Sequence, residues 1–274
     1  VGVRYTDRDG GAAHELRATL VVGCDGRHSR VRDELEMVPR PLAAPFDCRY
    51  VRVPKHDGDP DGSLVRFSAR GGLVMVDRGT YWQVAVLVGK GEPDELDVVR
   101  RSVRDLAPVL ADRVDAVPGA DIARLEVRQD RLRRWWAPGA LCIGDAAHAM
   151  TPVAGVGVNL AVQDAVAAAR VLVPPLLAGS VTDRHLAAVQ RRRLVPTVLT
   201  QLLQRETQRR AIVTPTRGPD EVRAPLRVPA PLRILRHVPG FLDLFGRVVA
   251  LGLLPEHLTG PLGAARNQTR RDGR

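Results

Sequence analysis

Short apolar runs, separated by clusters of Asp, Gly and Pro, divide the first part of the chain into strand-like pieces. Apolar and polar residues alternate from Val1 to Tyr5, a turn-rich stretch follows from Asp7 to Gly11, and a second run extends from Leu16 to Gly23. This pattern predicts a β-hairpin. The end of the second run, from Ala18 to Gly23, is nearly all apolar, which is typical of a strand buried on both faces.

More β-like runs follow, and turn-forming clusters separate them. They are Phe46–Val53, Leu64–Ser68, Leu73–Val76 and Tyr81–Val88. Closely spaced runs of this kind predict an antiparallel sheet, in a layer distinct from the strand at Leu20. Beyond the sheet, Asp94 to Arg113 has a helical pattern and Ile122 to Arg134 returns as extended chain.

The second half of the chain is mainly helical in pattern, after one short buried strand from Gly139 to Gly144. An alanine-rich helix is predicted from Asn159 to Val173, and it should end before Pro174-Pro175 because proline has no backbone N–H. A longer helix is predicted from Thr182 to Arg210, where Pro196 should kink or break it.

The last part of the chain, from Pro215 onwards, is rich in proline and arginine. Two short amphipathic helices are expected there, around Leu232 and from Phe241 to Leu254. Charged residues such as Arg236 and Asp243 interrupt its longest apolar stretch, so we expect no membrane span.

Arginine dominates the charge of the chain. The 274 residues include 41 basic and 31 acidic side chains, a net charge of +10, and Lys55 and Lys90 are the only lysines. Nucleic-acid binders usually gather basic residues on one face with aromatic residues among them. Here the arginines are scattered and aromatic residues make up only 4%, which favours a compositional bias and no nucleic-acid partner. The alternative is a basic binding module built from the Thr182–Arg210 helix, with its Gln190–Arg193 cluster, and from Arg270-Arg271.

Composition also bounds the class of protein and its compartment. With 45% hydrophobic and 26% charged residues, the chain is globular and long enough for one large or two ordinary domains. Cys24, Cys48 and Cys142 form no CxxC pair, so we expect reduced core thiols, no metal site and a cytoplasmic location. No signal peptide is visible, and because the chain starts at Val1 we expect it to be cut from a longer protein.

Two loops share one pattern, in which a buried strand meets an Asp/Gly turn and then the start of a helix. The first loop is Cys24–Ser29, and the second begins at Gly144-Asp145. Ligands of open α/β sheets bind at the carboxyl ends of strands, where the Asp145 carboxylate would suit a sugar or polyol hydroxyl. Gly155–Asn159 opens the alanine-rich helix, and its free N–H groups would suit a phosphate or an anionic ring. Pro152 stiffens the loop between these two parts.

Simpler interpretations exist for each residue taken alone. Asp145 could cap the following turn, and the glycines at 155 and 157 could be ordinary turn glycines. His148 has no partnered nucleophile or second metal ligand in the sequence, so a structural role is favoured over that of a base. Trp135 and Trp136 are expected to be packing residues. The strand, the Asp turn and the glycine-rich loop in this order nevertheless favour a cofactor loop.

At this point the sequence resembles a known family. Gly23-Cys-Asp25-Gly26-Arg-His-Ser29-Arg-Val-Arg32 is similar to the DG motif of the class A flavoprotein monooxygenases, the p-hydroxybenzoate hydroxylase-like group. The run from Gly144 to Ala165, GDAAHAMTPVAGVGVNLAVQDA, is similar to the GD motif of that family, and Gly72–Gln83 resembles its middle domain. The resemblance covers nearly the whole chain and is weakest after Pro215.

The resemblance implies an α/β fold, in which a partial FAD-binding, Rossmann-like domain accompanies an antiparallel-sheet substrate domain and C-terminal helices. The implied domains are 1–39 with the DG motif, 40–134 with the sheet, 135–175 with the GD motif, and 176–274 with the helices and tail. The strands that end at Gly23 and Gly144 should be neighbours in one sheet.

The resemblance also implies FAD as cofactor and a set of residues around it. Asp145 would contact the ribityl or pyrophosphate region, the backbone of Pro152–Asn159 would lie against the isoalloxazine ring, and the Asp25 loop would support the FAD and nicotinamide channel, with Ser29 and Arg32 as holders. The cofactor-binding residues so implied are Asp25, Gly26, Arg32, Gly144, Asp145, Ala146, Pro152, Gly155, Val156, Gly157, Val158 and Asn159. No catalytic base is assigned, because the flavin carries the chemistry in this family.

The implied reaction is hydroxylation of a small aromatic compound. NAD(P)H, as co-substrate, would reduce FAD, O₂ would add at the flavin C4a, and the resulting hydroperoxide would transfer oxygen to the substrate. Strands Phe46–Val53 and Leu73–Val88 would supply the pocket wall. A flavin halogenase or an isoprenoid-chain reductase of the same fold is the alternative, and the resemblance leaves room for a homodimer.

The chain departs from the family in one respect. No GxGxxG motif occurs, although these enzymes use one to hold the ADP half of FAD. About a hundred residues of the FAD domain are therefore expected to be missing, on the usual size of such a half-domain. We expect the chain alone to hold FAD weakly and to be inactive, and we favour a truncated chain over a missing half supplied by a partner.

Overall fold

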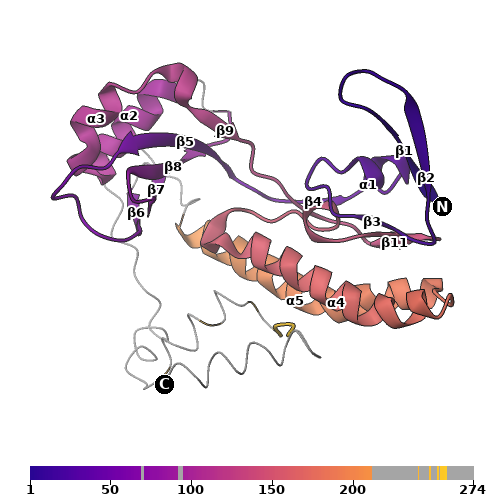
Figure 1. Cartoon of the computed structure of the whole chain (residues 1–274). Coiled ribbons are helices and arrows are strands. Elements are labelled where there is room, and N and C mark those ends of the chain that lie inside the picture. Colours follow the sequence, from indigo (N-terminus) through magenta and orange to yellow (C-terminus); the bar gives the residue numbers. More distant parts are fainter. Residues whose placement is uncertain are drawn as a thin grey trace, which may run out of the picture. The chain divides into compact units, whose positions relative to one another are not determined.

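A computed structural model gives the fold (Figure 1) and describes residues 1–68, 71–91 and 95–211, together with positions 240, 247, 252 and 254–257. These residues form two compact units. One unit contains residues 1–42, 128–203 and the described positions after 242, and the other contains residues 43–127 and 204–211 with position 240. Two expected features lie outside the described residues: the helix around Leu232 and the Arg270-Arg271 pair. Of the helix expected from Phe241 to Leu254, only positions 247, 252 and 254 are described.

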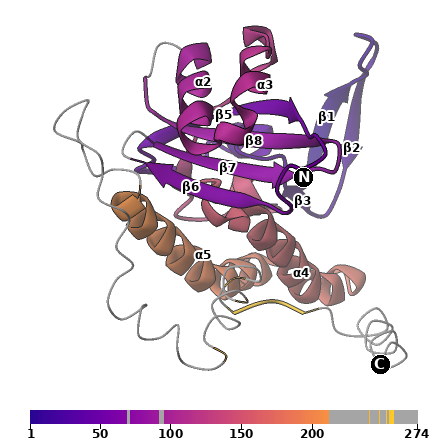
Figure 2. The ribbon, with the colours of Figure 1, turned by 90° about the vertical axis from the view of Figure 1, so that its left-hand side faces the viewer.

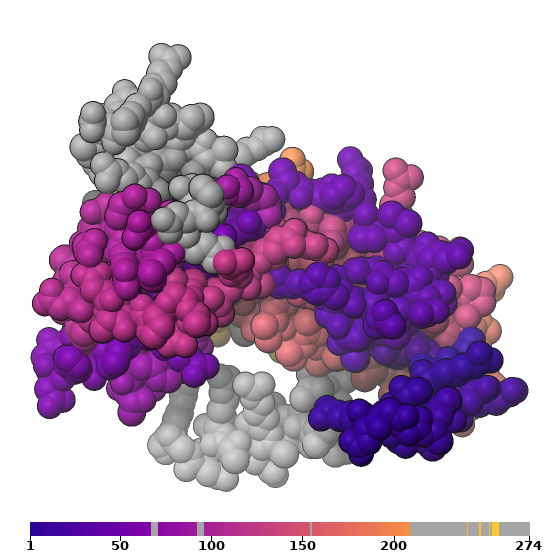
Figure 3. Space-filling model, turned by 90° about the horizontal axis from the view of Figure 1, so that it is seen from above, coloured from indigo at the N-terminus to yellow at the C-terminus, as the bar shows by residue number. Residues whose placement is uncertain are grey.

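The first unit begins with the predicted hairpin. β1 (Gly2–Thr6) pairs antiparallel with β2 (Ala13–Arg17), and the side chains of both strands are exposed at the edge of the unit (Figure 3). The prediction of one continuous strand from Leu16 to Gly23 is wrong. The chain changes partners between β2 and β3 (Val21–Gly23), because Val21 donates its backbone N–H to Gly139 in another sheet. Nor is the run buried on both faces, since Val22 is 39% exposed.

The strands that carry the two loops are neighbours, as predicted. β12 (Ala140–Cys142) lies between β3 and the two-residue strand β11 (Trp136–Ala137). β12 runs parallel to β3, with Cys142 opposite Gly23, so both strands end at the same edge of the sheet. A separate antiparallel pair joins β4 (Arg40–Leu42) to β10 (Gln129–Arg131).

Three helices follow the strands of this unit (Figures 1 and 2). They are α1 (Arg30–Glu34), α4 (Val156–Leu177) and α5 (Asp183–Ala211). The predicted end of α4 before Pro174-Pro175 is wrong: both prolines lie in its last turn, where Ala178 still donates to the Pro174 carbonyl. Of the kink or break predicted at Pro196, the break is absent. α5 runs through it, and the hydroxyl of Thr200 donates to the Pro196 carbonyl at 2.8 Å.

α4 is also the one helix in the described part of the chain that is long and apolar enough to cross a bilayer, with a mean hydropathy of 1.5 over its most apolar window. Core helices of globular proteins share this property. Asp164 in the middle of α4 is fully buried and paired with Arg193 of α5, which is the environment of a helix packed inside protein.

The second unit contains the predicted antiparallel sheet. Its strand order is β6-β7-β8-β5-β9, and all neighbouring pairs are antiparallel. The strands are β5 (Phe46–Pro54), β6 (Leu64–Ser68), β7 (Gly71–Asp77), β8 (Tyr81–Gly89) and β9 (Ala123–Leu125). The stretch Ile122–Arg134 is thus shared between β9 of this sheet and β10 of the other unit.

Helices cover one face of this sheet (Figure 2). The single helix predicted from Asp94 to Arg113 is instead α2 (Glu95–Leu106), a short 3-10 turn at Pro108–Leu110, and α3 (Ala111–Asp115). Pro108 explains the interruption, because it lacks the N–H that would continue α2. The core between sheet and helices includes Val51, Val53, Leu73, Met75, Trp82, Val84, Val86, Val99, Val103 and Leu110.

Candidate functional site

The first loop, at the end of β3, is organised by Asp25. The carboxylate of Asp25 accepts hydrogen bonds from the Ser29 hydroxyl at 2.5 Å and from the backbone N–H of Val31 at 3.2 Å. Burial acts to raise the pKa of Asp25, but these bonds outweigh it and hold the pKa below its usual value. Ser29 in turn caps α1 by accepting from the N–H of Arg32 at 3.0 Å. Asp25 and Ser29 therefore fix the start of α1 in the described structure.

Arg32 connects the first loop to the second. Its side chain is buried, and Nη2 donates to the carbonyl oxygen of Arg27 at 2.9 Å. Nη1 donates to the carbonyl oxygen of Ala146 at 3.4 Å. A second link is the ion pair between Arg27 and Asp145, in which Nη2 of Arg27 lies 3.5 Å from Oδ2 of Asp145. The structure thus brings together Asp25, Gly26 and Arg32 from one motif and Gly144, Asp145 and Ala146 from the other.

The second loop leaves β12 through a short 3-10 turn, Gly144–Ala146. Gly144 has a φ of +58°, in the left-handed region that favours glycine. A Cβ at this position would also lie 3.0 Å from the Cβ of Ala161 in α4. Glycine at 144 therefore allows the turn and lets α4 pack closely against it.

The loop ends in the predicted glycine-rich segment. Pro152 precedes a 3-10 turn at Val153–Gly155, and Gly155, with a φ of +65°, stands at the N-cap of α4. Among the described residues, no side chain caps the start of this helix. Val158 is 73% exposed while Val156 is buried, so the first turn of α4 has one face toward the protein and one face open. α4 begins at Val156, three residues earlier than predicted.

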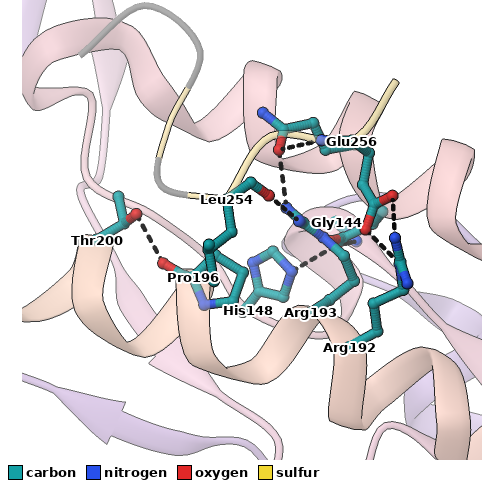
Figure 4. A network of polar contacts seen from close by, with 10 residues as sticks. Gly144, His148, Arg192, Arg193, Pro196, Thr200, Leu254 and Glu256 are labelled. Atoms are coloured by element: carbon teal, nitrogen blue, oxygen red, sulfur yellow. Dashed lines mark hydrogen bonds and ion pairs between the residues drawn. The ribbon is translucent and has the colours of Figure 1, made fainter. Parts of the chain in front are cut away.

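A buried charged cluster lies behind this loop, and sequence reasoning missed it. Asp164 accepts from the Gly144 N–H at 3.0 Å and from Arg193 Nε at 2.8 Å, and its Oδ2 is 2.5 Å from His148 Nε2 (Figure 4). Burial acts to raise the pKa of Asp164, but His148, Arg193 and the N–H of Gly144 together hold it below its usual value. Asp164 stands in the quoted GD motif, yet nothing in the sequence identified its distant partners.

His148 and Trp135 have the interior positions expected of structural residues. Both are almost completely buried, and their ring centroids lie 4.8 Å apart. Gln201 of α5 also contacts the loop. Its Nε2 donates hydrogen bonds to the carbonyl oxygen of Ala149 in the loop at 3.3 Å and to that of Asp130 at 2.8 Å. Trp136, by contrast, is half-buried and stacks with Arg134, whose Cζ is 3.5 Å from the ring centroid.

The basic cluster on α5 is largely engaged within the protein. Arg193 is fully buried against Asp164, and Arg192 pairs with Glu256. Gln190 accepts from the Trp135 N–H and donates to the Arg133 carbonyl. Arg193 is therefore withdrawn from the surface and Gln190 and Arg192 are engaged in internal contacts, although Arg191 and Arg192 remain exposed.

The cysteines depart in part from expectation. Cys48 and Cys142 are buried, as predicted, but Cys24 is exposed at the start of the first loop. Within the described residues no group of three or more His, Cys, Asp or Glu side chains could hold a metal ion.

Two strands that end side by side, with an Asp/Gly loop on each and a helix starting beyond, define a nucleotide-cofactor domain of the α/β class. The family comparison gives the same result more specifically. Residues 1–203 match the model of the FAD binding domain, and the chain belongs to that family. The predicted fold class and the resemblance to the class A flavoprotein monooxygenases are confirmed.

Relatives of this chain are monooxygenases. It is 35% identical over 202 residues to 6-methylpretetramide 4-monooxygenase of Streptomyces rimosus, covering 67% of this chain and 46% of the relative. It is 32% identical over 172 residues to aurachin C monooxygenase/isomerase of Stigmatella aurantiaca, covering 58% and 43%. It is 28% identical over 186 residues to kynurenine 3-monooxygenase of Xanthomonas euvesicatoria, covering 61% and 41%. The chain therefore spans less than half the length of these relatives.

Solved structures share the fold. One is PqsL, a probable FAD-dependent monooxygenase from Pseudomonas aeruginosa, with a TM-score of 0.60 and 23% identity over 73% of this chain and 57% of that one. Another is HpxO from Klebsiella pneumoniae complexed with FAD and uric acid, with a TM-score of 0.61 and 18% identity over 78% and 56%.

The described residues fit FAD at three points. The Asp145 carboxylate is 29% exposed at the strand end, so a hydroxyl could reach it. Among the described residues, nothing lies within 4 Å of the Cβ positions of Gly26 and Gly155, so the backbone of each loop is open to close approach. In the described part of the chain the start of α4 also lacks a side-chain cap, and the first turn of a helix carries N–H groups without a helical acceptor.

Proposed function

We propose that this chain serves an FAD- and NAD(P)H-dependent monooxygenase that hydroxylates a small aromatic compound. The observation that carries the proposal is the meeting of the two motif loops, through Arg27 with Asp145 and through Arg32 with the Ala146 carbonyl. Loops joined in this way at the ends of adjacent parallel strands form a single cofactor site.

Each part of the site has a role in the proposal. Asp145 accepts a hydroxyl of the ribityl chain or lies by the pyrophosphate, and the backbone from Pro152 to Asn159 faces the isoalloxazine ring. N–H groups at a helix start favour negative charge by about 0.3–1 kcal/mol, which suits an anionic ring. Asp25, Gly26 and Arg32 support the loop beside the nicotinamide channel. FAD, when bound, supplies electron transfer from NAD(P)H and the activation of O₂.

The proposed reaction balances as NAD(P)H + H⁺ + O₂ + R–H → NAD(P)⁺ + R–OH + H₂O. The names of the relatives support a small organic substrate, because they include 6-methylpretetramide, aurachin C and kynurenine. One structural neighbour is complexed with uric acid. We propose a cytoplasmic location and a homodimer.

The pocket wall is proposed to be the face of the five-stranded sheet opposite α2 and α3. Register places one row of side chains across this face, from β6 to β9: Val65, Val74, Ala85, Tyr50 and Ala123. Small and apolar side chains with one tyrosine in the row suit a flat ring that carries a polar substituent.

The cofactor part is tested by flavin retention. FAD is added to the purified chain, and bound flavin is measured by fluorescence titration for the wild type, Asp145→Ala and Asp183→Ala. Asp183 is an exposed acid in the first turn of α5, so its variant makes the same charge change away from the loops. We expect Asp145→Ala alone to weaken FAD binding by about tenfold, as for loss of a hydrogen bond to a charged group. Equal binding by all three proteins would reject the role of Asp145.

The reaction is tested by product mass. Because the chain alone is expected to be inactive, NADPH oxidation is followed in a protein that carries this chain together with a GxGxxG segment of the family. A panel of phenolic and other aromatic compounds is supplied, and products are examined by mass spectrometry. A gain of one oxygen supports hydroxylation. Chloride incorporation would instead identify a halogenase, and a gain of two hydrogens in an isoprenoid chain would identify a reductase; either result would overturn the proposed reaction while keeping the flavin.

A further inference from the structure

The loop of residues 144–150, here called the GD loop, is held from behind by buried charges. Asp164 of α4 binds the loop at two points, the backbone N–H of Gly144 and the ring of His148. Because the Asp164 side chain is fully buried, its charge depends on Arg193, which is also fully buried. A buried carboxylate that lost this partner would leave an uncompensated charge in the interior.

Arg193 is in turn held by residues far along the chain. Nη2 donates to Gln163 Oε1 at 3.3 Å, and Nη1 donates to the carbonyl oxygen of Leu254 at 3.5 Å. Leu254 has a φ of +54°, an unfavourable value for leucine. Backbone strain of this kind persists only where surrounding contacts fix the conformation.

An ion pair fastens this distant segment, residues 254–257, which we call the C-terminal clip. The carboxylate of Glu256 accepts from Arg192 Nε at 2.5 Å and Nη2 at 2.9 Å, a two-bond arrangement (Figure 4). The Glu256 carboxylate is only 4% exposed, and its backbone N–H donates to Gln163 Oε1 at 3.4 Å. Gln163 is thus shared between the C-terminal clip and Arg193.

We infer that Arg193 is a positioning residue for the GD loop and that the C-terminal clip, through Glu256 and Arg192, keeps it in place. The chain of contacts runs from Glu256 to Gln163 and Arg193, then to Asp164, and ends at Gly144 and His148. Loss of the clip admits water to the Asp164–Arg193 pair and loosens the backbone next to Asp145. The consequence for FAD rests on the proposed function, whereas the consequence for the loop does not.

The test is backbone hydrogen exchange, measured by mass spectrometry on the full chain without and with FAD. The variants are Glu256→Ala, Arg192→Ala and the exchanged pair Arg192→Glu/Glu256→Arg. Arg191→Ala is the matched control, because Arg191 is exposed on the same turn of α5. A peptide from β8 serves as the internal reference for overall stability.

We expect Glu256→Ala and Arg192→Ala to speed exchange of the GD loop by about tenfold, the effect of losing a charged hydrogen bond, with β8 and the control unchanged. The exchanged pair should restore most of the protection. Wild-type exchange of the GD loop in both single variants would overturn the inference, and so would an equal increase in β8, which would mean general destabilisation.

The FAD arm separates this inference from the proposed function. If FAD protects the GD loop of the wild type, the two clip variants should bind FAD more weakly in proportion to their faster exchange. If FAD at a concentration that saturates the fluorescence titration gives the wild-type loop no protection, the proposed function fails. The exchange rates without FAD still decide whether the clip holds the GD loop.

Discussion

Arg27 and Asp145 form an ion pair between the two motif loops, with Nη2 of the arginine 3.5 Å from Oδ2 of the aspartate. Their side chains are 24% and 29% exposed, so water reaches both partners. A partly solvated pair of this kind contributes about 1 kcal/mol or less to stability. A ligand hydroxyl could therefore replace the guanidinium at little cost, which is consistent with Asp145 as a binding residue and not a structural one.

Arg32 should matter more for stability than Arg27. Arg32 donates to the carbonyls of Arg27 and Ala146 from two different guanidinium nitrogens. A lysine at this position keeps the positive charge but has a single nitrogen, so it cannot bond both carbonyls in the same geometry. We expect Arg32→Lys to lower the free energy of unfolding by about 1.5–3 kcal/mol, measured by urea denaturation. Arg30→Lys, at an exposed position of the same helix, is the control and should stay within about 0.5 kcal/mol of wild type. Identical midpoints for the two variants would contradict the bridging role.

Gly144→Ala should destabilise the protein through strain and crowding together. Its φ of +58° disfavours alanine, and the new Cβ would press on Ala161. We expect a loss of about 1–3 kcal/mol in urea denaturation. Gly179→Ala is the matched control, because Gly179 has a φ of +64° but open space around its Cβ position among the described residues. A larger loss at 144 than at 179 measures the close approach of α4, and equal losses would show that crowding is unimportant.

The three cysteines should react at very different rates. Burial raises the pKa of Cys48 to about 12 and that of Cys142 to about 11, whereas Cys24 is exposed. Because the thiolate is the reactive form, we expect Ellman's reagent at pH 8 to label one thiol quickly in the native protein and three after denaturation. Mass spectrometry should place the fast label on Cys24. Fast labelling of Cys142 would show that β12 opens in the native state.

Asp59 should make the second unit sensitive to acid. Arg113 donates to both of its carboxylate oxygens, at 2.7 and 2.8 Å, and the indole N–H of Trp82 donates at 2.8 Å. The Arg113 hydrogen bonds hold the pKa of Asp59 well below its usual range. The stabilisation is therefore fully present above the unfolded pKa, about 3.9, and is lost as pH falls below it toward the folded pKa.

The measurement compares Asp59→Asn with Asp57→Asn, an exposed aspartate of the same loop. At pH 7 we expect Asp59→Asn to be less stable than wild type by about 1–3 kcal/mol, from the loss of charged hydrogen bonds. The difference should shrink as the pH is lowered from 4 to 2. A difference that stays constant over this range would mean that the ionisation of Asp59 does not contribute.

The sequence predicts the features that depend on local pattern. Alternation and turn residues locate the antiparallel sheet, and the family resemblance carried by the two motifs implies that β3 and β12 are neighbours. It fails where distant partners decide. Nothing within the run Leu16–Gly23 indicates that Val21 leaves the hairpin to pair beside Gly139. Nor does the sequence show that α4 continues through Pro174-Pro175, where the backbone N–H of Ala178 still donates to the Pro174 carbonyl.

The site divides in the same way. Asp145, Gly155 and the order of the motifs are visible in the sequence, because each follows a strand end or opens a helix. The buried cluster is not visible, since Asp164 reads as one acid on an alanine-rich helix and Arg193 as one arginine among many. Only the packing of α4 against α5 reveals that the two charges neutralise each other.

The parallel pairing of β3 with β12 also sets an order of events during synthesis. All five strands of the antiparallel sheet, and α2, lie between residues 46 and 125, so they leave the ribosome before β12 is made. β3 must wait without its partner until Cys142 emerges, and the Asp164–Arg193 pair and the Glu256 contact follow later still. Because domains fold as units while the chain grows, the five-stranded antiparallel sheet forms first. The two motif loops at the ends of β3 and β12 come together last.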